Sequence, residues 1–178
     1  MKTNTSLLLW AILIATFASA ADKYVSSEFG FAASYPADVV RTQVTSDVAS
    51  FAAKAPGGAW VAQVKAYKNV VMPQDVTKEF MEGKLKEVLR DGGMTQTGAT
   101  SYTTFQGHPA LVATATFIIN NGETNFVSYS AVVDMKLIFV KGQNLIKGQN
   151  RVYWVAGWAI QGKDRSGIQR FLDSFELR

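Results

Sequence analysis

Residues Val152–Ile160 read VYWVAGWAI, and this stretch decides the fold of the chain. Successive side chains of a β-strand point to opposite faces of its sheet. Here Trp154 and Trp158 would share one face, whereas Tyr153 and Val155 would share the other. A strand that is apolar on both faces belongs in the middle of a sheet that is covered on two sides. The sequence therefore predicts a layered domain built around this strand.

Much of the chain before this stretch alternates between apolar and polar residues, as is typical of half-buried strands. Turn-forming residues interrupt the alternation at Pro36, at Gly57-Gly58 and at Asn121-Gly122, and the last pair favours a tight hairpin. We expect strands over residues 29–35, 39–45, 48–55, 60–67, 94–105, 110–119 and 125–133.

Two segments have helical periodicity instead. The first follows Pro73 and carries an apolar stripe from Val76 to Leu89. It ends at Gly92-Gly93, where glycine permits the left-handed turn that ends many helices. The second runs from Asp164, the expected N-cap, to Phe175. Runs of strands with two helices, without strict β-α-β alternation, predict an α+β fold, namely a mainly antiparallel sheet flanked by helices.

Residues 1–20 have the three parts of a secretory signal peptide. Lys2 precedes an apolar run from Leu7 to Phe17, and Ala18-Ser19-Ala20 supplies a small-x-small cleavage site. The run is shorter than the roughly 20 residues that a membrane-spanning helix needs. An uncleaved anchor and a buried helix are the alternatives. We expect cleavage after Ala20, no permanent membrane span, and a soluble protein that acts outside the cytoplasm, either periplasmic or secreted.

Cleavage would leave 178 − 20 = 158 residues, numbered 21–178, which is the usual size of one domain. Without Lys2 the 18 basic residues become 17 against 14 acidic ones, a net charge of +3. Because these charges are spread along the chain, no nucleic-acid partner is expected. The sequence contains no cysteine, so an exported domain of this kind relies on its apolar core without a disulfide framework.

The side chains exclude several kinds of catalytic and metal site. His108 is the single histidine and lies in a Gly-His-Pro turn, so a serine nucleophile lacks its usual partners. The common zinc sites need three or four Cys or His ligands, which the chain does not have. No phosphate loop or calcium loop is present. We assign no catalytic residue, cofactor or metal ligand, although a pair of carboxylates from distant strands stays an open alternative.

Two groups of residues are candidates for binding. The tryptophans Trp60, Trp154 and Trp158 could line a pocket for a small molecule, although their strand spacing favours core packing. The second group belongs to a short duplication, because Lys-Gly-Gln-Asn at 141–144 recurs at 147–150. We interpret the duplication as a lengthened hairpin or loop, and its alternative role is an interaction loop that includes the cations Lys136, Lys141, Lys147 and Arg151.

Several pieces of the chain resemble PsbP-like domains, in the same order. Residues 29–36 match an opening Phe-Gly-Phe-x-x-x-Tyr-Pro, and Phe105-x-Gly107-x-Pro109-Ala110-Leu111 is similar to a later strand start. Val152-Tyr153-Trp154 leads into the last long strand, and residues 171–175 resemble a closing Phe-x-x-Ser-Phe. The resemblance implies an antiparallel sheet sandwiched by helices. Photosynthetic members of that family assist a membrane complex from its lumenal side. No site residue is carried over from the family.

A full set of core patterns without a catalytic constellation predicts a non-enzymatic, exported accessory domain that acts through protein–protein contact. Its expected partner is another extracytoplasmic or membrane protein. The alternative is a small-ligand or lipid-binding module with an aromatic-lined pocket, and a weaker alternative is a carboxylate-based hydrolase.

Overall fold

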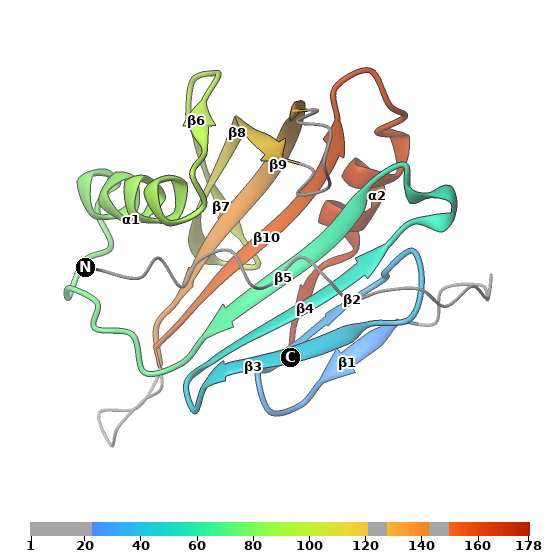
Figure 1. Ribbon diagram of the computed structural model, residues 1–178. Coiled ribbons are helices and arrows are strands. Elements are labelled where there is room, and N and C mark those ends of the chain that lie inside the picture. Colours follow the sequence, from blue (N-terminus) through green and yellow to red (C-terminus); the bar gives the residue numbers. More distant parts are fainter. Residues whose placement is uncertain (1–22, 121–127, 143–149) are drawn as a thin grey trace, which may run out of the picture.

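The computed structural model describes residues 23–120, 128–142 and 150–178. A large antiparallel sheet forms most of it (Figure 1). The strand order across this sheet is β3 (Val40–Thr45), β4 (Val48–Lys54), β5 (Val61–Tyr67), β10 (Arg151–Ile160), β9 (Ser128–Val140), β8 (His108–Asn120) and β6 (Thr95–Gln96), with β7 (Ser101–Phe105) also paired to β8.

Strand β10 lies in the middle of the large sheet, as its sequence predicts. Val155 is opposite Val64 of β5 on one side and opposite Lys136 of β9 on the other. Tyr153 and Val155 are buried towards one face of the sheet, and Val152 and Ala156 are buried towards the other. The two apolar cores of the protein therefore meet at this strand.

A second, three-stranded sheet covers one face of the large sheet. It has the order β1 (Tyr24–Ser26), β2 (Phe31–Ala33) and β11 (Glu176–Leu177). The ring of Phe31 lies 5.0 Å from that of Phe51 in β4 and 5.5 Å from that of Phe175. These three side chains are fully or almost fully buried, so the small sheet closes this core with aromatic contacts.

Helix α1 (Lys78–Asp91) lies at the β6–β8 end of the opposite face (Figure 1). Thr77 caps its start, because the Phe80 N–H donates to Thr77 Oγ1 at 3.3 Å. Met81, Leu85 and Leu89 are buried from it, together with apolar residues of β8, β9 and β10. The helix stops where Gly93 takes a φ of +61°, a conformation that glycine adopts without strain.

Helix α2 (Ser166–Ser174) packs on the other face, directly over β10. Gly157 of β10 permits the close approach, because a Cβ there would lie 2.4 Å from Ile168 Cγ2. Lys136 of β9 ties the far end of the helix to the sheet by donating to Leu172 O at 3.1 Å and to Asp173 Oδ1 at 3.0 Å. A cation at this position also complements the negative end of the helix dipole.

The predicted fold class, an α+β sandwich of a sheet flanked by helices, was wrong. Of the described residues, 50% lie in strands and 18% in helices, and the protein is mostly antiparallel β-sheet. The expected antiparallel pairing is present. However, the face of the large sheet that carries α2 is covered largely by the small sheet. Strand β2 lies inside the predicted strand over residues 29–35. Its partners β1 and β11 have only three and two residues, which is too short for a period-two pattern to distinguish them from loops.

Three element boundaries also differ from those predicted. Helix α1 begins at Lys78, just after the start of the predicted apolar stripe at Val76, and the expected strand over 94–105 is divided into β6 and β7. Strand β9 continues to Val140, beyond the predicted end at residue 133. The signal peptide, the Asn121-Gly122 turn and most of the Lys-Gly-Gln-Asn duplication lie outside the described residues.

Candidate functional site

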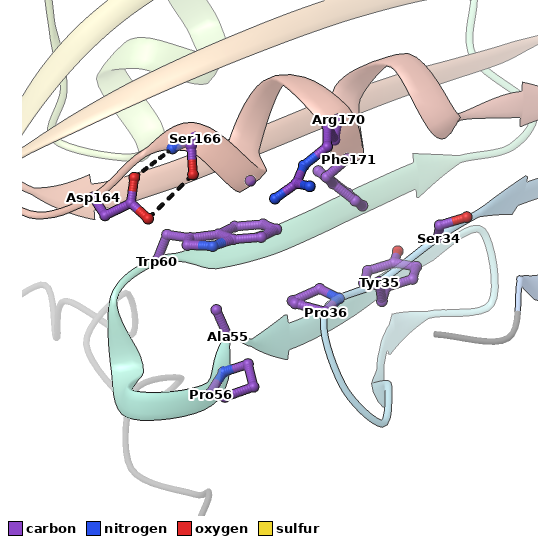
Figure 2. Close-up of a pocket in the computed structure, with 11 residues that line it drawn as sticks. Ser34, Tyr35, Pro36, Ala55, Pro56, Trp60, Asp164, Ser166, Arg170 and Phe171 are labelled. Carbon is purple, nitrogen blue, oxygen red and sulfur yellow. Dashed lines mark hydrogen bonds between the residues drawn. The ribbon is translucent and has the colours of Figure 1, made fainter. Parts of the chain in front are cut away.

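A hollow of about 370 Å³ opens beside the first turn of α2. This volume lies within the range of sites that hold small molecules. Three segments that are far apart in the sequence form its walls: the chain after β2, the turn between β4 and β5, and the start of α2 (Figure 2). Its lining residues are Ser34, Tyr35, Pro36, Ala55, Pro56, Trp60, Asp164, Ser166, Gly167, Arg170 and Phe171.

Trp60 is positioned by the 3₁₀ turn Pro56–Gly58, which links β4 to β5. The turn is closed by hydrogen bonds from Ala55 N to Trp60 O and from Gly58 N to Ala55 O, both 2.9 Å. Gly57 and Gly58 each have a φ of +70°, which residues other than glycine rarely adopt. The Gly57-Gly58 pair, read from the sequence as a turn, therefore fixes where the tryptophan emerges.

The indole of Trp60 lies against the first turn of α2 (Figure 2). A Cβ on Gly167 would lie 2.4, 2.6 and 2.7 Å from Cζ2, Cε2 and Nε1 of the indole, so only glycine permits this contact. The centroid of the Phe171 ring lies 6.4 Å from that of the Trp60 ring, and the two ring planes are inclined at 46°. Trp60 is half-buried, with the helix on one side and the hollow on another.

The carboxylate of Asp164 stands at the rim, just before α2. It accepts hydrogen bonds from the Ser166 N–H at 2.9 Å and from the Ser166 hydroxyl at 3.1 Å. These two bonds, with a smaller contribution from the charge of Arg170, hold the pKa of Asp164 below its ordinary value. The group is therefore ionised at neutral pH. The prediction that Asp164 is the N-cap of α2 was wrong by one residue, because Arg165 occupies that position. The Asp164 carboxylate still accepts a hydrogen bond from the Ser166 N–H at the start of the helix.

Arg170 is the cation of the hollow. Its guanidinium points toward the open space between Trp60 and Pro36 (Figure 2). Within the described residues it has no hydrogen bond and no ion pair, and it interacts only electrostatically, with Asp164. The side chain is exposed, so its five N–H donors are available to a bound group.

Tyr35 and Pro36 form the wall opposite Arg170. The Tyr35 hydroxyl donates to Phe51 O at 3.3 Å. Burial raises the pKa of Tyr35 well above its ordinary value of 10.0. The hydroxyl therefore keeps its proton and donates it to this hydrogen bond. The charged groups of the hollow therefore lie on the α2 side, at Asp164 and Arg170.

The structure separates the three tryptophans that the sequence groups together. Trp154 and Trp158 of β10 belong to the core under α1, on the opposite face of the sheet from Trp60. The ring of Trp158 lies 5.4 Å from that of Phe117 in an edge-to-face contact. Because the sheet lies between Trp60 and the other two tryptophans, no single pocket contains all three indoles.

The predicted basic loop is also divided. Lys136 lies inside β9 and binds the end of α2 rather than projecting from a loop. Lys141 donates to Gln74 O, Arg151 begins β10 and donates to Phe29 O at 3.2 Å, and Lys147 lies outside the described residues. The three described cations therefore have structural contacts with separate parts of the protein.

The described residues place no pair of acids in the hollow and no cluster of metal ligands elsewhere. Among the described residues that line the hollow, Asp164 is the only carboxylate. Over residues 23–120, 128–142 and 150–178, no three His, Cys, Asp or Glu side chains lie close enough together to hold a metal ion. Within the same ranges, no helix is both long and apolar enough to cross a membrane. His108 is the first residue of β8 and does not line the hollow.

Comparison with known proteins adds a likeness of fold. No protein-family model matches the chain, and no curated protein matches its sequence. A crystal structure of a protein from Bacteroides thetaiotaomicron matches with a TM-score of 0.50 and 11% sequence identity, over 90% of this chain and 49% of that one. The chain thus spans about half the length of that protein. At this identity the likeness concerns the fold alone, and the PsbP-like resemblance stays a prediction.

Sequence reasoning did not single out Arg170, the cation that lines the hollow. Its neighbours Ile168, Phe171 and Leu172 carry the apolar pattern of the helix, and an arginine between them is typical of a solvated helix face. The sequence carries no mark that this face of α2 meets the turn before β5, because that contact joins segments more than 100 residues apart.

Proposed function

We propose that the protein is a non-enzymatic binding domain that acts outside the cytoplasm and holds a small ligand in the hollow beside α2. The observation that carries this proposal is the hollow itself, where an exposed arginine without a hydrogen-bond partner in the described chain faces an aromatic wall. Apolar walls with a few convergent polar groups are typical of small-molecule sites.

The charges of the hollow favour binding over turnover. Carboxylate-based hydrolysis uses two acids, one of which has a raised pKa so that it can give up a proton near neutral pH. Asp164 is a single carboxylate among the described lining residues, and its pKa is lowered. A group of this kind suits electrostatic recognition better than proton transfer.

A variant with one tryptophan tests the proposal. Replacing Trp154 and Trp158 by phenylalanine in a chain that begins at residue 21 leaves Trp60 as its only indole. We expect members of a small-molecule library to change the emission of Trp60, and a matched variant that also carries Trp60→Phe to show no change. If no compound alters Trp60 emission in a protein that is folded by circular dichroism, the hollow is not a ligand site and the proposal fails.

A second candidate is the protein–protein contact that the sequence suggests, and strand β3 favours it. In the described chain β3 pairs only with β4, so its other edge offers unpaired backbone groups, and Val40 and Val44 on it are 37% and 46% exposed. An exposed edge of this kind can accept a strand from a partner.

Cross-linking in the native compartment tests this candidate. Val44→Lys places a charge on the edge, which hinders strand addition, and Val71→Lys is the matched control because Val71 is 89% exposed and lies outside the strands. Loss of a cross-linked species in the first variant and its retention in the second would support edge pairing. Equal cross-linking in both would exclude it.

A further inference from the structure

The charges and rings of the hollow indicate the class of its ligand. We propose that it takes a flat aromatic ring that bears one carboxylate, with the ring beside Trp60 and the carboxylate on Arg170. This inference rests on the proposed function and specifies the ligand of the same site.

The carboxylate follows from Arg170. A guanidinium presents its N–H donors in a planar fork, which matches the two oxygens of a carboxylate and binds them in parallel. Ion pairs within the described chain involve Arg41, Arg90, Arg165 and Arg178, but not Arg170. Because no protein acid takes its fork, Arg170 can receive an anion without first breaking an internal bond.

The ring follows from the walls around that cation. Trp60 and Phe171 stand on the α2 side, and Pro36 and Pro56 stand across the opening (Figure 2). Gly167 lets the indole pack directly against the start of α2, because a Cβ at this position would lie 2.4 Å from Cζ2 of the ring. A flat ring loses less conformational entropy when it binds between such walls than a flexible chain does, since it has fewer rotatable bonds to immobilise.

The single charge follows from Asp164. This carboxylate lines the same hollow and is held in its ionised form by Ser166. Its field opposes any anion at Arg170. The attraction of Arg170 and the repulsion of Asp164 both grow in proportion to the charge of the ligand, so a second negative charge gains little net attraction. Taking that second charge out of water still costs free energy. A carboxylate carries one negative charge, whereas a phosphate monoester carries nearly two at neutral pH. The hollow therefore favours the carboxylate over the phosphate.

The test titrates the single-tryptophan protein with three probes at neutral pH: phenylacetate, phenylacetamide and phenyl phosphate. All three carry the same ring, and they differ in the charge of the attached group. We expect phenylacetate to change Trp60 emission with the lowest Kd. The Kd of each of the other two probes should be at least about tenfold higher. Isothermal titration calorimetry on the protein with all three mature tryptophans provides the same ranking without the substitutions.

Two further variants locate the charge effect. Arg170→Gln should raise the Kd of phenylacetate about tenfold and leave that of phenylacetamide nearly unchanged. Lys163→Gln is the matched control, since it removes one exposed positive charge from the loop before α2 but from outside the hollow. It should change neither value by more than about twofold, the scale of a screened charge effect.

The outcomes separate the ligand class from the proposed function. Equal binding of phenylacetate and phenylacetamide, or an unchanged phenylacetate Kd in Arg170→Gln, would overturn the carboxylate proposal while leaving a ligand site at Trp60. Tighter binding of phenyl phosphate would also overturn it, in favour of a dianion. If none of the three probes binds, the class is wrong, and the proposed function then depends on whether any library compound changes Trp60 emission.

Discussion

Replacing Gly167 by alanine should force a methyl group into the indole of Trp60. The added Cβ would lie 2.4 Å from Cζ2 of the ring, whereas carbon atoms in ordinary contact are about 3.5–4.0 Å apart. The ring must therefore move by about 1 Å, away from the helix and toward the open hollow.

The expected cost comes from two opposing effects. Alanine is better than glycine in a helix by up to about 1 kcal/mol, and overpacking of this kind costs about 1–3 kcal/mol. Because the ring can yield toward the hollow, we expect a net loss of about 1 kcal/mol. In a protein of this size, 1 kcal/mol corresponds to a change in Tm of about 2–4 °C.

Gly83→Ala is the matched control. Gly83 lies inside α1, and in the described chain no atom outside its own helix and its neighbours lies within 4 Å of a Cβ placed there. The same substitution should therefore stabilise the protein by about 0.5–1 kcal/mol. The two variants should differ in Tm by about 4 °C or more, with opposite signs relative to the parent.

The assay is urea and thermal unfolding followed by circular dichroism, with tryptophan emission recorded on the folded variants. Trp60 emission should shift to longer wavelength in Gly167→Ala, because the displaced ring gains solvent. If Gly167→Ala stabilised the protein as much as Gly83→Ala and left the emission unchanged, the close contact between Trp60 and α2 would be disproved.

Three further outcomes test the fold. Gly157→Ala should destabilise the protein by about 1–3 kcal/mol in urea unfolding, because a Cβ there would lie 2.4 Å from a side chain of α2, and wild-type stability would refute the seating of that helix. Phe51→Ala should cost about 3–5 kcal/mol, since this ring is fully buried among other aromatic rings, and a loss below about 1 kcal/mol would argue against the aromatic core. Hydrogen bonds from Gln169 and Lys136 lower the pKa of Asp173, so this carboxylate stabilises the fold above its ordinary pKa and loses that contribution as the pH falls through the lowered value. Asp173→Asn should therefore lower the free energy of unfolding by less than about 1 kcal/mol at neutral pH, as the Asp173 side chain is 58% exposed. Unfolding measured from pH 7 downward should show the difference between variant and parent vanish in acid. A difference that persisted in acid would assign the effect to the shape of the side chain.

The expected export of the protein has a direct measurement as well. Expression of the full chain with its first 20 residues in a bacterial host, followed by mass spectrometry, should give a mature protein that starts at Ala21. A product that retains residues 1–20 would refute the predicted cleavage.

Local patterns in the sequence were enough to place most of the large sheet. The paired strands near residues 39–45 and 48–55, the strand ending at Tyr67 and the central strand over 152–160 all form close to their predicted positions. The helix over 164–175 also forms, as α2. Each of these elements is specified by its own period of apolar residues, and that period does not depend on what the element packs against.

The tertiary structure decided what covers each face. Strand β11 pairs with β2, so that Leu177 lies opposite Phe31, and this closes the core with a sheet where the sequence suggested helices. A period reveals which side of an element is buried, but it does not reveal the identity of the covering layer. This is the reason that the predicted helix-flanked class failed while the central strand did not.

The candidate site was specified in the same unequal way. The sequence marked Trp60 as a possible pocket residue and Gly57-Gly58 as a turn, because both are local features. It grouped Trp60 with Trp154 and Trp158, but the structure places these two on the opposite face of the sheet from Trp60. It gave no reason to choose Arg170, since only the seating of α2 on β10 brings that guanidinium beside the hollow. The sequence thus determined the strands and their buried faces, while the packing of distant segments decided which side chains share a site.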